Sequence, residues 1–217
     1  MEDDLCNQYI PAMTTRPYEQ RRRADAAEET RRRILDAAAS RLRSAPSQPV
    51  SLDAVASDAG VSRSTVYLAF ESRAGLFDAV AADVLQRAGH RRLVEAVAHL
   101  DAGQALRGGF RAGTAMYAAD PDVFRALFSM SALGEDLTGG TIRRWERTRA
   151  LGVSRLARRL REQGILRADV GEQDAADLLW VLTSFEAYDL LRARRGLDGT
   201  EAAEALFAAA ERGLWTV

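Results

Sequence analysis

The side chains best suited to chemistry stand together in one short segment, Ser62-Arg63-Ser64-Thr65. They open the second of two short predicted helices, and these two capped helices, three residues apart, form a tight helical corner. Such a helix-turn-helix places the start of its second helix in the DNA major groove, where exposed side chains read base edges. The positive end of that helix also attracts phosphate. The segment therefore predicts recognition of nucleic acid.

Catalytic chemistry is not expected in this chain. The sequence has no glycine loop suited to phosphate, no nucleophile elbow and no cluster of metal ligands. Its only histidines, His90 and His99, lie near Arg91 and Arg92, and its single cysteine, Cys6, cannot form an internal disulfide. We therefore expect no enzyme, no cofactor and no metal. The cysteine usage is typical of the reducing cytosol.

The composition predicts an all-helical protein with a proper core. Of the 217 residues, 40 are Ala and 25 are Leu, but only 13 are Val and 4 are Ile. Because β-branched side chains suit sheets, this ratio favours helices. No apolar run reaches 18 residues, and the first 20 residues carry acids where a signal peptide needs bases. We expect a cytoplasmic protein without a membrane partner.

The net charge of −1 conceals a basic segment near the N-terminus. Residues 16–44 carry nine Arg and five acidic residues, whereas residues 45–217 carry 21 Arg and 23 acidic residues. A local excess of positive charge is typical of a nucleic-acid partner. The run Arg31–Arg33 is compatible with phosphate contacts and equally with a solvated helix face.

Residues 21–72 are predicted to form the recognition unit, with residues 1–20 as a disordered tail. The first helix should begin near Asp25, whose carboxylate can cap it while Glu28 reaches back in a capping box. Four apolar residues should form its buried stripe, namely Ile34, Leu35, Ala38 and Leu42.

Serines mark the starts of the next helices. Ser51 should cap a helix over residues 52–59 that Gly60 ends, and Ser62 should cap the second helix. Ser72 should cap a long helix over residues 73–100 that tolerates Gly89 and connects the recognition unit with the rest of the chain.

The second predicted domain, residues 73–217, contains further helices over 104–119, 122–132, 141–163, 173–195 and 200–212, with a loop over 134–140. The helix over 173–195 is apolar around most of its circumference, which requires burial on more than one side. We expect it and the last helix to form a four-helix homodimer interface with their symmetry mates, although a merely central helix is the alternative. The expected interface residues are Leu178, Val181, Leu182, Phe185, Leu206, Phe207 and Ala210.

One segment resembles a known family. The run Val61-Ser62-Arg63-Ser64-Thr65-Val66-Tyr67, followed by Phe70, Ser72, Leu76 and Phe77, is similar to the signature of TetR family transcriptional regulators. The resemblance is specific over residues 28–80. It is looser beyond, at Gly164-Ile165-Leu166-Arg167 and Leu178-Leu179-Trp180. It implies a three-helix DNA-binding unit joined to a helical core that binds a ligand and dimerises.

By position, the resemblance implies contacts with double-stranded operator DNA. Arg63 and Ser64 would reach base edges, since a guanidinium can donate two parallel hydrogen bonds to guanine. Further expected contacts are phosphates or a thymine methyl at Thr65 and Tyr67, the DNA backbone at Ser51 and Ser62, and a clamped phosphate at Arg73.

The sequence departs from the family at Leu68 and Ala69, where most members place polar or aromatic residues that bind phosphate. One backbone contact per subunit would then be missing, which predicts a shallower dependence of DNA binding on salt. Leu68 could instead pack against a thymine methyl.

The resemblance also implies that the core holds a small apolar or amphipathic effector. Large side chains on the central helices could line its cavity, although aromatic residues at helical spacing are also typical of a plain core. The candidates are Phe110, Thr114, Tyr117, Phe124, Phe128, Trp145 and Phe185.

We therefore expect a homodimeric repressor that binds a palindromic operator and is released by an effector that prefers the other state of the dimer. A dimeric ligand-binding or interaction module with weakened DNA reading is the alternative that Leu68 and Ala69 favour. A helical-bundle enzyme would need a reactive constellation that the sequence lacks. The sequence does not specify the effector, the operator, the target genes or the sign of regulation.

Overall fold

The structure of the chain is a computed structural model that describes residues 15–45, 50–134 and 140–215. Within these ranges the chain is helical, apart from turns and one isolated bridge between Leu166 and Trp215. The all-helical prediction is confirmed. The helices are α1 (Thr15–Ser44), α2 (Leu52–Asp58), α3 (Arg63–Phe70), α4 (Arg73–Arg87), α5 (His90–Val97), α6 (Ala102–Ala118), α7 (Pro121–Leu133), α9 (Thr141–Glu162), α10 (Glu172–Leu182), α11 (Phe185–Arg195) and α12 (Gly199–Leu214).

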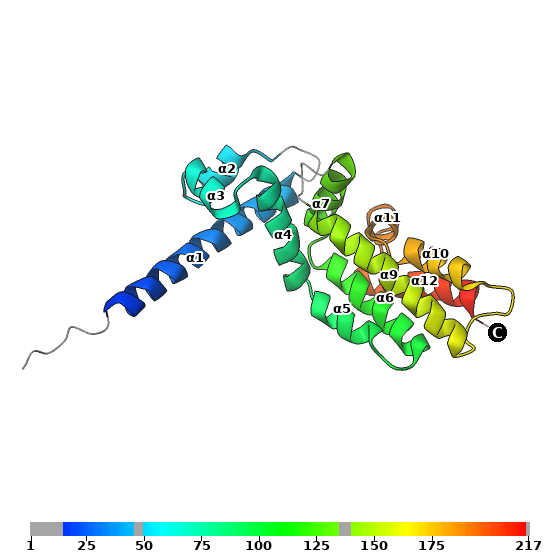
Figure 1. Cartoon of the computed structure of the whole chain (residues 1–217). Coiled ribbons are helices and arrows are strands. Elements are labelled where there is room, and N and C mark those ends of the chain that lie inside the picture. Colours follow the sequence, from blue (N-terminus) through cyan, green and yellow to red (C-terminus); the bar gives the residue numbers. More distant parts are fainter. Residues whose placement is uncertain (1–14, 46–49, 135–139, 216–217) are drawn as a thin grey trace, which may run out of the picture.

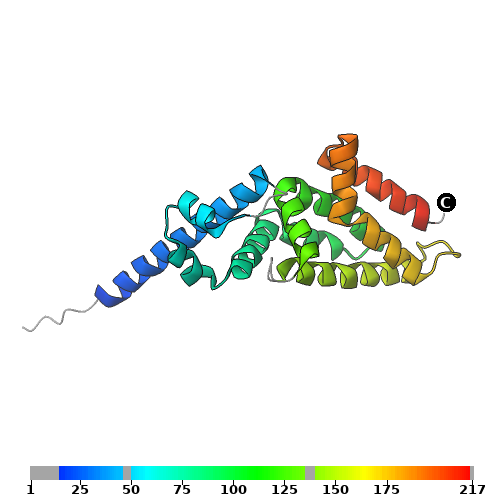
Figure 2. The ribbon, with the colours of Figure 1, turned by 90° about the horizontal axis from the view of Figure 1, so that it is seen from above.

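The molecule is elongated, with two groups of helices joined through α4 (Figure 1). Helices α1, α2 and α3 form one end, and α5 to α12 form the larger core at the other end. The view from above shows the same order along the molecule (Figure 2). In both views the beginning of α1 projects past α2 and α3, away from the core. No helix of the described ranges is long and apolar enough to cross a membrane.

The helix α1 begins at Thr15, which corrects the start predicted at Asp25 and removes residues 15–20 from the predicted tail. Pro17 lies in the first turn, where proline is tolerated because the first N–H groups of a helix have no partner within it. The rest of the predicted tail, residues 1–14, lies outside the described residues. The predicted apolar stripe at the other end of α1 is buried, from Ile34 to Leu42.

The corner between α3 and α4 depends on a close approach of backbones. Ser72 caps α4 as predicted, since its Oγ accepts a hydrogen bond from the Gly75 N–H at 2.9 Å. A Cβ at position 75 would lie 2.2 Å from the Phe70 carbonyl oxygen, closer than any real Cβ contact. The glycine therefore lets the first turn of α4 pack on the end of α3.

The predicted connecting helix over residues 73–100 is wrong, because it is broken at Gly89. Gly89 has φ +99°, a left-handed conformation that helices do not contain, and α5 starts immediately after it. A side chain at position 89 would also meet the Arg92 side chain at 2.9 Å. The connection is therefore α4 alone, and α5 belongs to the core, where it packs along α6.

The single helix predicted over residues 173–195 is also interrupted, between Leu182 and Phe185. The Thr183 hydroxyl donates to the Leu179 carbonyl at 2.6 Å, while the Ser184 hydroxyl caps α11 by accepting from the Ala187 N–H. Arg149 of α9 donates to the Trp180 carbonyl at 2.6 Å and to Thr183 at 3.0 Å. Side chains thus replace the helical hydrogen bonds at this break, and hydroxyl residues are the ones that offer such an exchange.

Ion pairs hold the recognition unit against the core. Arg43 near the end of α1 makes two hydrogen bonds, of 2.5 and 3.2 Å, to Asp120 at the start of α7. Asp78 of α4 accepts from the Thr141 N–H at 2.6 Å and from Arg144 at 3.0 Å. Its carboxylate therefore sits at the N-terminus of α9, where negative charge is favourable.

The buried apolar residues of the recognition unit and of half the core form one continuous cluster. It runs from Ile34 and Phe70 through Phe77 of α4 to Phe124 and Tyr188. A second cluster fills the far half of the core between α6, α9, α10 and α12. The recognition unit thus shares packed contacts with one half of the core.

Candidate nucleic-acid interface and core cavity

The start of α3 presents a group of hydroxyls. Ser62 caps the helix as predicted, since its Oγ accepts from the Thr65 N–H at 3.1 Å. The same oxygen lies 2.7 Å from the Ser64 hydroxyl and 2.8 Å from the Thr65 hydroxyl. Ser62 and Ser64 are exposed and Thr65 is half-buried. The predicted contact residues therefore lie together at the positive end of the helix.

Arg63 is exposed beside this group and is held in place from two sides. Its Nη1 lies 3.0 Å from an Asp53 carboxylate oxygen on α2, and its Nη2 donates to the Tyr67 hydroxyl at 3.4 Å. Both partners raise the pKa of Arg63, the Tyr67 hydroxyl more than Asp53. Because both partners are exposed to solvent, this ion pair contributes little to stability. The guanidinium is thus oriented by weak interactions that a stronger partner can replace.

Tyr67 and Leu68 continue the exposed face of α3. Tyr67 is 40% exposed, and Leu68 is 88% exposed although it is apolar. A leucine that projects so far from a helix surface gains nothing from folding, because its apolar area stays in water. The structure thus places an apolar side chain on the same exposed face as the polar residues predicted to contact DNA, whereas Ala69 is half-buried.

The two flanking candidates differ in their surroundings. Ser51 stands at the N-cap of α2, but its side chain makes no capping hydrogen bond and is exposed. Arg73 is half-buried, with its guanidinium 5.0 Å from the Phe77 ring centre and 3.5 Å from the Val50 carbonyl oxygen. Ser51 therefore offers a hydroxyl, whereas Arg73 would have to leave its present contacts to clamp a phosphate.

Arg31 and Arg33 have a role that neither interpretation of the arginine run included. Arg31 donates to the Ala69 carbonyl at 3.0 Å and lies over the Phe70 ring, so it binds the C-terminal end of α3. Arg33 donates to the Ala59 carbonyl at 3.0 Å, at the end of α2. Cations are favourable at helix C-termini, where carbonyls lack helical partners. These two arginines stabilise the corner itself.

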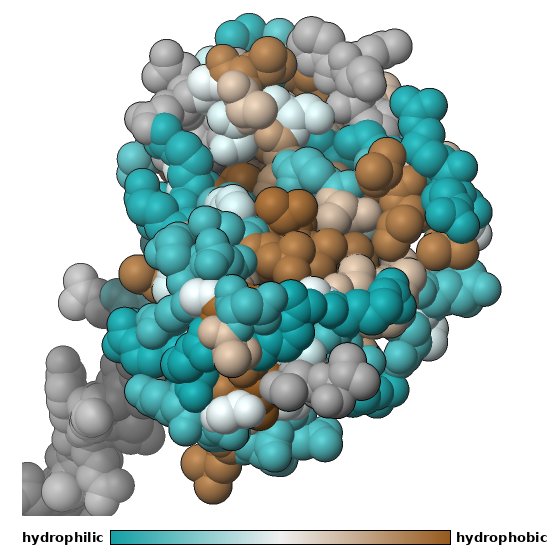
Figure 3. All heavy atoms as spheres, turned by 90° about the vertical axis from the view of Figure 1, so that its right-hand side faces the viewer, coloured by the Kyte–Doolittle hydropathy of each residue, from teal (hydrophilic) through white to brown (hydrophobic). Residues whose placement is uncertain are grey.

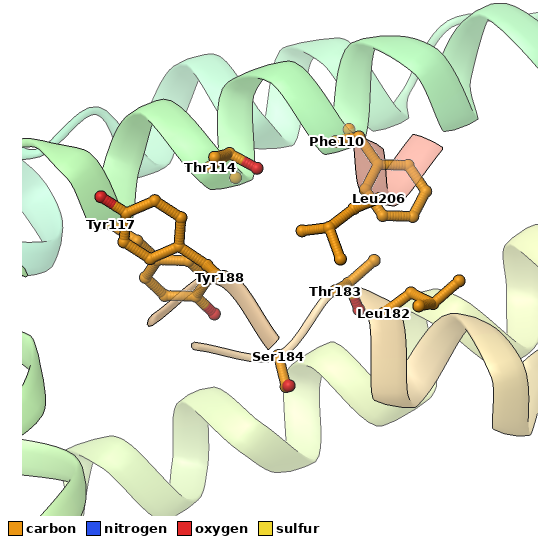
Figure 4. A pocket seen from close by; sticks show the side chains of 10 residues that line it. Phe110, Thr114, Tyr117, Leu182, Thr183, Ser184, Tyr188 and Leu206 are labelled. Carbon is orange, nitrogen blue, oxygen red and sulfur yellow. The ribbon is translucent and has the colours of Figure 1, made fainter. Parts of the chain in front are cut away.

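A small cavity lies in the core beside the break between α10 and α11 (Figure 4). Its volume is about 20 Å³, which is room for one or two water molecules. Three predicted ligand residues line it together, Phe110, Thr114 and Tyr117 of α6. The sequence did not indicate the opposite wall, which consists of Leu182, Thr183, Ser184, Tyr188 and Leu206.

The other predicted ligand residues do not line the cavity. Phe124, Phe128 and Phe185 surround Tyr117 with ring centres 5.4 to 6.3 Å away. Burial raises the pKa of Tyr117 well above its usual range, so its hydroxyl stays neutral. Trp145 packs edge-on against His90 at 5.2 Å, and its buried Nε1 has no hydrogen-bond partner within the described structure. These residues form a packed aromatic cluster, and none of these four lines the cavity.

The predicted interface residues divide into two sets. Phe185, Leu206, Phe207 and Ala210 are buried inside the subunit, so they cannot offer surface to a partner, which corrects their assignment. Val181 is 59% exposed, and Leu178 and Leu182 are half-buried. The side view of the core shows apolar side chains gathered near the middle of its end, surrounded by hydrophilic ones (Figure 3). The described residues contain no group of side chains suited to a metal ion.

Comparison with known proteins supports the interpretation of the N-terminal end. Residues 34–80 match the family model described as bacterial regulatory proteins, tetR family. This range contains α2 and α3 completely, and with them the residues that the sequence predicts to contact DNA, from Ser51 to Arg73. No curated protein sequence matches the chain.

Solved structures share the fold over most of the chain. NalD, the secondary repressor of the MexAB-OprM multidrug efflux pump in Pseudomonas aeruginosa, is 24% identical, with a TM-score of 0.68 over 88% of this chain and 98% of its own. A TetR-like transcriptional regulator from Rhodococcus sp. RHA1 is 22% identical, with a TM-score of 0.61 over 85% and 94%. The ketosteroid transcriptional regulator KstR2 of Mycobacterium tuberculosis is 16% identical, with a TM-score of 0.64 over 86% and 95%.

Proposed function

Because the chain belongs to the TetR family of transcriptional regulators, we propose that it is a repressor that binds a palindromic operator as a homodimer and is released by a small apolar or amphipathic effector. The observation that carries this proposal is the start of α3. There, Arg63 and a group of hydroxyls stand exposed at the positive end of a rigidly packed helix. Arg63 reads guanine, since its planar guanidinium can donate two hydrogen bonds to that base.

Phosphate contacts position this helix on the duplex. The exposed hydroxyl of Ser51 and the N-terminus of α3 are the groups best placed to bind phosphate. Asp53 exchanges its guanidinium partner for solvent when Arg63 turns to a base. The exchange is inexpensive because the ion pair is exposed on both sides.

A homodimer explains why the operator should be palindromic, since two copies related by a twofold axis read two identical half-sites. The accessible apolar residues of α10 and α11 support this face as the interface. Val181 of α10 is 59% exposed and Leu190 of α11 is 62% exposed. Leu178 and Leu182, on the same helix as Val181, are partly exposed.

Release follows from the position of the cavity. A volume of about 20 Å³ is far below the 300–1,000 Å³ of typical ligand pockets, so an effector must displace the walls. One wall is Tyr117, which belongs to the same apolar cluster as Phe77 of α4. Displacement of this cluster shifts α4 and with it the distance between the two reading helices of a dimer. The effector weakens operator binding by its preference for the displaced state.

The proposal is tested by titrating purified protein against a duplex selected from a random DNA pool, with unselected DNA as competitor, at two salt concentrations. We expect a dimer that binds specifically and more weakly at higher salt. Arg63→Ala should lower operator affinity by about 1–3 kcal/mol per subunit. Arg147→Ala, which removes an exposed arginine from the core helix α9, is the matched control and should bind normally.

Two results would overturn the proposal. Equal affinity for selected and unselected DNA would leave the interaction module with weakened DNA reading as the better explanation. If light scattering shows a monomer at micromolar concentration, the protein cannot read the two half-sites of a palindrome as a preformed twofold dimer.

The effector is tested on the preformed DNA complex with a panel of small apolar and amphipathic compounds. Thr114→Leu, which fills the cavity wall, should resist a compound that releases DNA from the original protein. Its melting temperature shows whether it still folds. Equal release from both proteins would move the effector site away from the cavity.

A further inference from the structure

The part of α1 from Tyr18 to Glu29 is a helical arm to which the described residues give no tertiary support. Every side chain from Tyr18 to Glu29 is exposed, and burial begins only with Thr30. An isolated helix of this length is marginal in water, so the arm depends on the packed half of α1 to nucleate it. The matched family region starts at residue 34, so the arm lies outside it.

The arm carries its positive charge at its far end. Residues 15–24 contain Arg16, Arg21, Arg22 and Arg23 against one acid, Glu19. The side chains of Arg21, Arg22 and Arg23 are exposed, and Arg22 lies over the Tyr18 ring. Three acids, Asp25, Glu28 and Glu29, then separate this basic end from the helix-turn-helix. A cluster of three adjacent exposed arginines is therefore presented at a distance from the reading helix.

The direction of the arm is set by the fold. In both ribbon views it projects past α2 and α3 on the side away from the core (Figures 1 and 2). DNA that meets the start of α3 must also lie on a side that the core does not occupy. The basic end of the arm thus lies on a side of the molecule that the core leaves open to a duplex.

From this geometry, and resting on the proposed DNA-binding function, we propose that Arg21, Arg22 and Arg23 form a second DNA contact, to phosphates that flank the bases read by α3. Arg22 lies 12 residues before Ile34, about 18 Å along the helix at 1.5 Å per residue. That span corresponds to about five base pairs of duplex at 3.4 Å each. The contact adds affinity that depends on DNA length and on salt, and it adds little sequence preference, because phosphates carry no base information.

The test compares two duplexes, the selected operator alone and the same operator with eight flanking base pairs of random sequence at each end. The original protein should bind the longer duplex about tenfold more tightly at 0.1 M salt. Arg21→Ala/Arg22→Ala/Arg23→Ala should bind both duplexes alike, and its slope of log affinity against log salt on the longer duplex should fall by about 0.9 for each lost contact. The three replaced side chains are exposed. The melting temperature of this variant should therefore equal that of the original protein.

Two further variants make the result specific. Arg21→Lys/Arg22→Lys/Arg23→Lys keeps the charge and should keep the length effect, and a loss would overturn the assignment to phosphate. Arg147→Ala/Arg155→Ala/Arg158→Ala removes the same charge from the exposed face of α9 and should keep the length effect. If this α9 variant loses as much of the length effect as the arm variant, net charge explains the effect and a specific contact by the arm does not.

The arm and the proposed function can fail separately. The arm variant could bind the short operator specifically and gain as much affinity from the flanking base pairs as the original protein does. That result would overturn the arm contact but leave the proposed reading role of α3 intact. Absence of specific binding to either duplex overturns both.

Discussion

The exposed start of α3 and the cavity of the core, the two sites of the proposed function, differ in how much must move before each could bind a ligand. On α3 the polar groups already stand in water, held by weak exposed interactions such as that between Arg63 and Asp53. In the core, Phe110, Thr114 and Tyr117 are almost completely buried around about 20 Å³ of space. The first site is formed by local helix geometry, whereas the second exists only through packing between helices far apart in the sequence.

This difference explains how one site could control the other. A preformed polar surface binds without reorganisation, so its affinity is sensitive mainly to where the whole helix lies. A tightly packed cluster resists small displacements and transmits larger ones, because interiors have few voids. The apolar cluster from Tyr117 to Phe77 and Phe70 is the physical connection between them.

The largest effect should come from removing a member of that cluster. Phe124 is fully buried, and Phe124→Ala should lower the free energy of unfolding by about 3–5 kcal/mol through lost burial and a new cavity. Both regions should unfold in one denaturant transition, since they share the cluster. Leu133→Ala, at an 80% exposed position of the same helix, is the control and should change stability by no more than about 0.5 kcal/mol. Two separate transitions in Phe124→Ala would break the comparison, because the regions would then be energetically independent.

The stability of the junction between the two regions should decrease in acid, because it depends on the ionised carboxylate of Asp78. Burial alone would raise the pKa of Asp78, but hydrogen bonds from Thr141 and Arg144 outweigh it and hold the pKa below its usual value. Because the folded pKa lies below the unfolded one, this stabilisation is complete above about pH 4 and is lost as the pH falls through the folded pKa. Asp78→Asn should cost roughly 1–2 kcal/mol at pH 7 and less at pH 3, measured by urea unfolding. An equal cost at both pH values would show that the carboxylate charge does not stabilise the junction.

Substitutions of two N-cap serines should have different effects on stability and on DNA binding. Ser184 accepts a hydrogen bond from the Ala187 N–H at 3.1 Å, so Ser184→Ala should cost about 1 kcal/mol of stability. Ser51 makes no capping bond, so Ser51→Ala should change stability by less than about 0.5 kcal/mol but weaken operator binding. Thermal unfolding and DNA titration of both variants give the comparison. Equal losses of stability would contradict the difference between the two caps.

The smallest effect on stability should come from Leu68, whose side chain is 88% exposed. Leu68→Ala should melt normally and lose about 1 kcal/mol of operator affinity per subunit if the side chain packs against a thymine methyl. Replacing thymine by uracil in the operator removes that methyl group. The original protein should then lose affinity while Leu68→Ala does not, and equal losses would exclude the methyl contact.

Much of the recognition unit could be predicted because its signals are local. Ser62 and Ser72 are caps as predicted, since a capping bond spans only three residues. The apolar stripe of α1 followed from helical spacing. By contrast, the predicted cap at Asp25 places the start of α1 ten residues too late. The paired roles of Arg31 and Arg33 depend on carbonyls 38 and 26 residues away.

The core was predicted less well because its decisive contacts are distant. The break between α10 and α11 depends on Arg149, which lies 31 and 34 residues before its partners Trp180 and Thr183. Leu206 looked like an interface residue because apolar periodicity indicates burial but not the partner. The structure places it inside the subunit, beside the cavity.

The sequence by itself determined the helical fold, the helix-turn-helix and the polar residues at the start of its second helix. These depend on propensity, caps and spacing, which act within one or two turns of helix. Only the tertiary structure decided that α4 ends at Gly89, that Tyr188 and Leu206 close the cavity, and that the basic end of α1 stands clear of the fold. Those features depend on which surfaces meet, and a pattern of apolar residues states that a face is buried without stating against what.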